Sequence, residues 1–205
     1  MTPLRSLLAT LFVIASAHPA VAAPGVTDAD LRLQDTGWTI DHLEITGADR
    51  PGVRHLTVSG RFGLPANRVW RAIAYENETD WPGIDQGTIE YQNGDTTIAC
   101  YKISVPVFKD RRYRLRIVND DASMREDFYQ VPGYGNVKAI DGMWVVMPIS
   151  DRVTRVDYIL DTDPGVKLVP GFIINWATKR MVPDIYEHIY KAATTDAARL
   201  GAKSE

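Results

Sequence analysis

The sequence predicts an α+β protein in which a curved antiparallel β-sheet wraps around one long C-terminal α-helix. Between residues 38 and 161, short segments alternate apolar and polar residues and are separated by Gly, Asn, Asp and Pro turn signals, as strands require. After Pro170, apolar residues recur at three- and four-residue spacing, which predicts an amphipathic helix. This predicted face consists of Val169, Phe172, Ile173, Trp176 and Ala177. The 205 residues, 45% of them hydrophobic, fit one domain.

Residues 1–22 have the layout of a cleavable secretory signal peptide. A basic start at Arg5 precedes an apolar run over 7–15, and the small-residue pattern Ala20-Val21-Ala22 follows. The apolar run is short for a membrane span, although an uncleaved N-terminal anchor is the alternative. We therefore expect cleavage after Ala22, a single mature domain over 23–205, and a periplasmic or secreted protein.

The first half of the domain predicts a hairpin followed by a helix. Residues 38–46 and 53–62 are extended runs around a Gly- and Pro-containing turn at 47–52. Pro65 suits the first turn of a helix, and the helix is expected to stop before Trp81. Its apolar stripe is Val69, Trp70, Ile73 and Ala74.

The middle of the chain predicts a run of antiparallel strands. Segments 88–92 and 96–104 flank Asn93-Gly94-Asp95, a hairpin turn signal. In the next strand, Arg112, Arg114 and Arg116 alternate with a mostly apolar face. That apolar face carries Arg111, Tyr113, Leu115 and Ile117. Strands over 125–131, 142–148 and 152–161 then lead into the C-terminal helix, which contains Pro183. This proline is expected to let the helix bend, separating a lid from an anchored end.

Composition and motifs favour binding over catalysis. A net charge of −3 gives no basis for nucleic-acid binding. The single cysteine, Cys100, cannot form an intramolecular disulfide and is expected to be a small buried residue on a strand. Glu126 and Asp127 are adjacent on a strand, which sends them to opposite faces rather than pairing them for acid/base chemistry. Since no histidine cluster, phosphate loop or serine elbow occurs either, we predict no catalytic residue, no metal and no cofactor.

Three stretches resemble the START-like lipid-binding domains of the START/polyketide-cyclase superfamily. The first is the helix LPANRVWRAIAYENETDW, and the second is PVFKDRRYRLR entering a strand. The third covers residues 141–189, from a Trp-bearing strand through Asp163-Pro164-Gly165 to the final helix with Asn175 and a mid-helix proline. Their order and spacing, rather than any one motif, carry the resemblance, which covers roughly residues 56–193.

The resemblance implies a helix-grip fold with a hydrophobic cavity between the sheet and the C-terminal helix. The arginine that in the family points into the cavity falls on Arg111. The sequence departs from the family pattern at the next position, Arg112, and the preceding strand TTIACYKIS has no carboxylate. For the strand over 142–148, either Met143, Val145 and Met147 or their neighbour Trp144 face inward. The predicted ligand-binding residues are Arg111, Tyr113, Leu115, Trp144, Tyr158, Phe172, Ile173 and Trp176.

The expected function is to bind, and to transport, a lipid or other hydrophobic small molecule. We expect a monomer that makes transient membrane contact and binds no nucleic acid. One alternative is an aromatase/cyclase-like enzyme on the same fold, using Arg111, Tyr113 or Tyr158 for orientation or proton transfer. Another is a module for ligand sensing or for interaction with the cell envelope.

Overall fold

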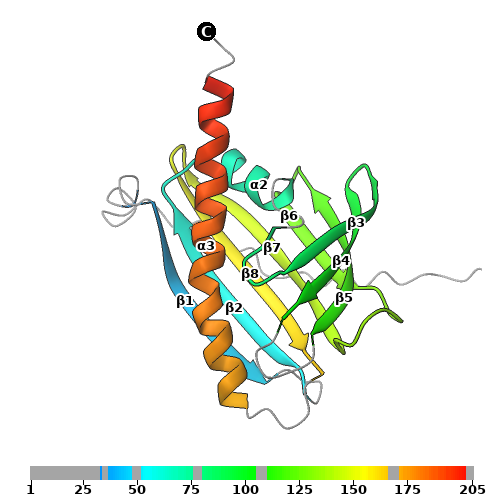
Figure 1. Ribbon diagram of the computed structural model, residues 1–205. Helices are drawn as coiled ribbons and strands as arrows, with labels where there is room; N and C mark the ends of the chain where they lie inside the picture. Colours follow the sequence, from blue (N-terminus) through cyan, green and yellow to red (C-terminus); the bar gives the residue numbers. More distant parts are fainter. Residues whose placement is uncertain are drawn as a thin grey trace, which may run out of the picture.

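The computed structural model describes residues 33, 37–47, 52–75, 80–104, 110–165 and 171–201, without the side chains of 171–174, 176 and 196–201. The predicted signal peptide and Val169 lie outside the described residues. Figure 1 shows a broad curved sheet with one long helix lying across its concave face.

The described chain forms eight strands and two helices. The hairpin β1 (Trp38–Gly47) and β2 (Arg54–Phe62) precedes the short helix α2 (Ala66–Ala74). Six strands follow before α3 (Gly171–Gly201) ends the fold. These strands are β3 (Gln86–Asn93), β4 (Thr96–Ile103), β5 (Arg111–Asp120), β6 (Arg125–Gln130), β7 (Ala139–Ser150) and β8 (Val153–Asp163).

All eight strands belong to one antiparallel sheet in the order β1-β2-β8-β7-β6-β5-β4-β3. The hairpin from the start of the domain therefore pairs with the last strand, β8, and the sheet does not close into a barrel. The Asn93-Gly94-Asp95 signal gives the predicted hairpin, in which Asn93 pairs with Thr96 and Gly94 takes a φ of 60°. Glycine adopts this left-handed conformation without strain.

A glycine lets the sheet pack tightly at its centre. Gly142 on β7 pairs with Phe128 on β6. A Cβ atom at position 142 would lie 2.4 Å from the Phe128 ring and 2.3 Å from the Ile159 carbonyl oxygen. Only a residue without a side chain leaves room for the Phe128 ring to lie over β7, and that ring forms part of the concave surface.

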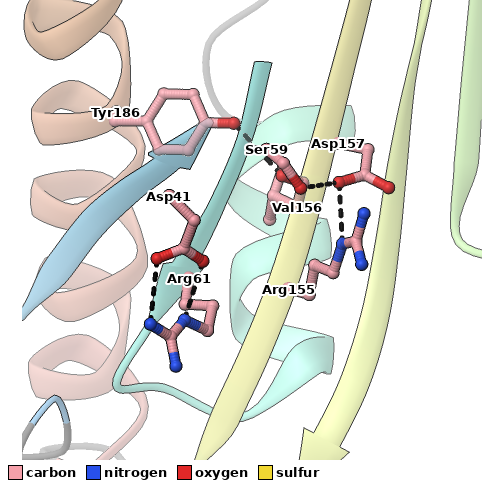
Figure 2. Close-up of polar contacts among 7 residues, drawn as sticks. All are labelled: Asp41, Ser59, Arg61, Arg155, Val156, Asp157 and Tyr186. Carbon is pink, nitrogen blue, oxygen red and sulfur yellow. Dashed lines mark hydrogen bonds and ion pairs between the residues drawn. The ribbon is translucent and has the colours of Figure 1, made fainter. Parts of the chain in front are cut away.

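Helix α3 is held on the sheet by a buried stripe in its middle part. The stripe consists of Val182, Ile185, Tyr186, Ile189 and Ala193. The Tyr186 ring stacks on Phe62 with centroids 5.4 Å apart, and its hydroxyl donates a hydrogen bond of 3.1 Å to the Val156 carbonyl oxygen (Figure 2). The expectation that Ala177 belongs to the buried face is wrong, because Ala177 is exposed. Burial on α3 follows contact with the sheet rather than apolar spacing alone.

Polar pairs join the outer face of β1, β2 and β8 (Figure 2). Arg61 makes two hydrogen bonds to the Asp41 carboxylate, at 2.7 and 2.9 Å. Asp157 accepts hydrogen bonds from Ser59 and Arg155. These polar residues alternate along the strands with buried ones such as Val58 and Val156, so the sheet has one wet face and one dry face.

Candidate functional site

A cavity of about 230 Å³ lies on the dry face of the sheet, between the strands and α3. Strands β4 to β8, helix α3 and the chain just before β3 contribute residues to its wall. The lining residues are Trp81, Pro82, Gly83, Ile84, Tyr101, Ile103, Tyr113, Leu115, Ile117, Glu126, Phe128, Val137, Ile140, Trp144, Tyr158, Leu160, Thr162, Pro164, Thr178, Met181 and Ile185. Such a mainly apolar wall with a few polar groups is typical of small-molecule sites.

Stacked aromatic rings form one wall of the cavity. The Trp144 indole lies on the Tyr158 ring with centroids 3.9 Å apart, and Trp81 stacks on the same indole at 5.7 Å. Trp144 and Tyr158 are direct cross-strand partners on β7 and β8, which places their side chains on the same face. Trp81 precedes β3 outside any helix or strand, and its stacking packs this part of the chain onto the sheet.

Four of the predicted ligand-binding residues line the cavity: Tyr113, Leu115, Trp144 and Tyr158. The alternation along β5 and β8 therefore identified the inward faces correctly. Two alternatives were open for the inward face of β7, and the structure favours Trp144, which is buried and lines the cavity. Met143, Val145 and Met147 do not line it. The side chains of Phe172, Ile173 and Trp176 lie outside the described residues, so their predicted role stays a prediction.

Arg111 lies beside the cavity rather than among its lining residues. It begins β5 and pairs with Ile103, a lining residue at the end of β4. Its Nε atom is buried and has no hydrogen-bond partner among the described residues. Arg111 lies two residues before Tyr113 on β5, so it belongs to the same face of the strand, as the alternation predicts. It stands at the end of the cavity where β5 begins.

Glu126 is a cavity residue that we did not predict. It is only 6% exposed, and it lies on β6 directly opposite Trp144 on β7. Its neighbour Asp127 faces outward and pairs with Arg125 at 2.6 Å, so the expected separation of the two carboxylates is correct. The signal in the sequence was the alternation of Glu126 with Phe128, which puts both side chains on the inward face.

The tyrosine hydroxyls of the cavity remain protonated over the physiological pH range. Burial raises the pKa of Tyr113 far above its ordinary value. Burial raises the pKa of Tyr158 similarly, and the charges of Tyr113 and Glu126 raise it further. Both phenols therefore keep an O–H group that can donate a hydrogen bond inside the cavity.

The described part of the chain contains neither a candidate metal site nor a helix that could span a membrane. No group of three or more His, Cys, Asp or Glu side chains there has the arrangement that a metal ion needs. Among the helices in the described ranges, none has the length and apolar character to cross a membrane. Cys100 is buried on β4, as predicted, and accepts a hydrogen bond from Arg114 at 3.4 Å.

Solved structures share this architecture at low sequence identity. The human protein STARD10 is 16% identical, with a TM-score of 0.54 over 83% of this chain and 81% of that chain. A STAR-related lipid transfer protein of Xanthomonas axonopodis is 14% identical, with a TM-score of 0.53 over 77% and 99% of the two chains. The Zhui aromatase/cyclase of a Streptomyces species is 18% identical, with a TM-score of 0.53 over 72% and 94%.

Comparison of the sequence alone gives no such match. No family model matches the chain, and no curated protein does. The structural likeness, together with the eight-stranded sheet and the helix lying on it, shows that the protein has the same helix-grip fold as these START-type and aromatase/cyclase proteins. The predicted fold class is therefore confirmed.

Proposed function

We propose that the protein binds one hydrophobic small molecule or lipid in this cavity and carries it through water. The observation that carries the proposal is the apolar cavity itself, walled by Trp81, Trp144 and Tyr158 and covered by α3. Each methylene group removed from water stabilises the complex by about 0.8 kcal/mol, so a chain-like ligand gains affinity without a catalytic group. The lipid-transfer protein with the same fold supports this proposal.

The first experiment is native mass spectrometry of protein purified without detergent. A bound lipid-sized mass that leaves on activation supports the proposal. A second measurement follows the fluorescence of N-phenyl-1-naphthylamine, an uncharged probe that brightens in apolar surroundings. Protein that carries no mass and does not brighten the probe would overturn the proposal.

Two variants on one strand locate the binding. Leu115→Asp puts a charge into the cavity wall and should abolish brightening of the probe. Arg116→Asp changes the exposed face of the same strand and should leave it unchanged. Should Leu115→Asp fail to fold by circular dichroism, Ile140→Arg, at a partly buried lining position, serves the same purpose. Equal brightening by all variants would place binding elsewhere.

A cyclase-type enzyme is the second candidate. It is favoured by one observation, the presence of a buried carboxylate, Glu126, in the same cavity as two protonated phenols. A carboxylate can remove a proton next to a carbonyl group while phenols donate to the carbonyl oxygen. Incubation with a poly-β-ketone, followed by chromatography of the products, tests this candidate. A cyclised product that the wild type forms and Glu126→Gln does not is expected only if the protein is an enzyme.

We also propose that the chain is exported, with residues 1–22 removed. The basic start, apolar run and Ala20-Val21-Ala22 pattern support this proposal. The intact mass of the exported protein tests it, with a first residue of Ala23 expected. A mass that retains Met1 would contradict cleavage.

A further inference from the structure

Two of the three tyrosines that line the cavity have hydroxyl groups without a hydrogen-bond partner among the described residues. Tyr113 on β5 and Tyr158 on β8 are 7% and 9% exposed, and both line the cavity. Neither hydroxyl makes a hydrogen bond within the described part of the chain. Tyr186 differs, since its buried hydroxyl donates to the Val156 carbonyl oxygen at 3.1 Å. The fold thus satisfies a buried phenol where it packs α3 but leaves two unsatisfied where the cavity lies.

The two hydroxyls are not among the fully buried polar atoms that lack a partner, so they face the open space of the cavity. A donor in such a place usually gains a partner from a ligand or from water. High pKa values keep both phenols protonated, so the missing partner is a hydrogen-bond acceptor. Tyr113 and Tyr158 come from different strands, β5 and β8, and line the same cavity. Each hydroxyl can therefore donate to an acceptor atom of a ligand held in the cavity.

The charges around the cavity limit what that acceptor can be. No lysine, arginine or histidine is among the lining residues in the described ranges, whereas Glu126 contributes a carboxylate. Arg111 lies beside the cavity, at the end where β5 begins, but is not among its lining residues. A carboxylate or phosphate held against the two phenols would therefore share an apolar wall with Glu126 and with no lining cation, which is unfavourable. A hydroxyl or carbonyl oxygen accepts from the phenols without that penalty.

We infer that the cavity selects uncharged hydrophobic molecules that carry a hydroxyl or carbonyl oxygen, placed against Tyr113 and Tyr158, and rejects the corresponding anions. This inference rests on the proposed function, because it specifies what the cavity binds. It identifies the two phenols as specificity-determining residues and the ligand class as neutral alcohols and ketones.

The test compares four ligands of one shape by isothermal titration calorimetry at pH 7.5. These are naphthalene, 2-naphthol, 2-acetylnaphthalene and 2-naphthoate, offered to protein refolded from urea to remove co-purified ligand. We expect 2-naphthol or 2-acetylnaphthalene to bind about tenfold more tightly than naphthalene, equivalent to about 1.4 kcal/mol. Whichever of 2-naphthol and 2-acetylnaphthalene binds more tightly shows whether the cavity prefers a hydroxyl or a carbonyl oxygen. We expect 2-naphthoate to bind more weakly than naphthalene.

Phenylalanine variants assign the effect to the two phenols. Tyr113→Phe and Tyr158→Phe should each reduce the advantage of the oxygen-bearing ligand over naphthalene, and the double variant should abolish it. Naphthalene affinity should stay the same, because the rings remain. Tyr186→Phe is the matched control, since it removes a buried hydroxyl that does not line the cavity.

The outcomes separate this inference from the proposed function. If naphthalene binds but the oxygen adds no affinity, or if 2-naphthoate binds most tightly, the inference is wrong while the hydrophobic cavity stands. If the oxygen helps equally in the double variant, the phenols are not responsible and the inference is again wrong. If none of the four ligands binds and N-phenyl-1-naphthylamine is not brightened, the proposed function itself fails.

Discussion

Trp144 and Tyr158 lie face to face across β7 and β8, with their ring centroids 3.9 Å apart and their planes 12° from parallel. This pair forms a wall of the cavity and also supports Trp81 above it. A single pair of rings therefore contributes to stability and to the shape of the site.

Truncating the indole should affect both properties. Trp144→Ala removes a large buried side chain and should lower the free energy of unfolding by about 3–5 kcal/mol. Urea denaturation followed by circular dichroism measures the change. Tyr129→Ala, at an exposed aromatic residue 49% accessible to solvent, is the control and should stay within about 0.5 kcal/mol of the wild type. Similar losses in both variants would show that the stacked pair has no special importance.

Replacing Glu126 tests how the cavity treats charge. Glu126→Gln removes a carboxylate from the cavity wall and should raise the affinity for 2-naphthoate, because one source of repulsion is lost. Calorimetry with the wild type and the variant gives the ratio of affinities. Asp127→Asn makes the same chemical change on the opposite face of β6 and should leave the affinity unaltered. An unchanged affinity in Glu126→Gln would contradict a repulsive role for this carboxylate.

Substitution of a central glycine tests the close packing of the sheet. Gly142→Ala places a Cβ atom 2.4 Å from the Phe128 ring and 2.3 Å from a backbone oxygen, so the strand has to shift. We expect a loss of about 1–3 kcal/mol or more in the free energy of unfolding, measured in urea. Gly47→Ala is the matched control, because nothing lies within 4 Å of its added methyl group. A stable Gly142→Ala protein would mean that Phe128 can leave its position over β7.

A carboxylate that ties α2 to the sheet should make stability depend on pH. Asp121 accepts hydrogen bonds from Tyr75 at 2.6 Å and from Trp70 at 2.8 Å, and these lower its pKa below the ordinary aspartate value. Since the pKa is lower in the folded protein, ionisation favours folding at pH values above about 4, and this contribution is lost as the pH falls through the folded pKa.

Asp121→Ala should therefore be less stable than the wild type at pH 7, and part of that difference should disappear in acid. Thermal unfolding at pH 7 and below pH 4 measures it. Asp151→Ala, in the exposed turn between β7 and β8, should show no comparable pH-dependent difference. A difference between Asp121→Ala and the wild type that is the same at both pH values would rule out the linkage.

The strand faces could be predicted because each depends only on neighbours two residues apart. Tyr113 and Leu115 on β5, and Tyr158 on β8, follow from this period. The place of Glu126 in the cavity wall was not predicted, because a carboxylate is among the residue types least expected inside an apolar cavity. The alternation along β6 predicts that Glu126 faces inward, but it does not predict what the carboxyl group does there.

Two other residues depend on tertiary structure that no local pattern encodes. Trp81 lies in a loop without periodicity, and only the folded chain brings it onto Trp144. Ala177 has the spacing of a buried helical residue but is exposed, because it lies on a face of α3 that does not contact the sheet. Local periodicity thus predicts which residues share a face, whereas the partner of that face is set by the whole fold.

The pairing of β2 with β8 also bears on how quickly the protein folds. Residues 54–62 meet residues 154–162, so the two strands that complete the sheet are about a hundred positions apart in the chain. Such distant pairing makes closure slow compared with the formation of local hairpins. We therefore expect the β1–β2 hairpin to keep one edge unpaired until β8 has formed, so that the full eight-stranded sheet is completed late in folding.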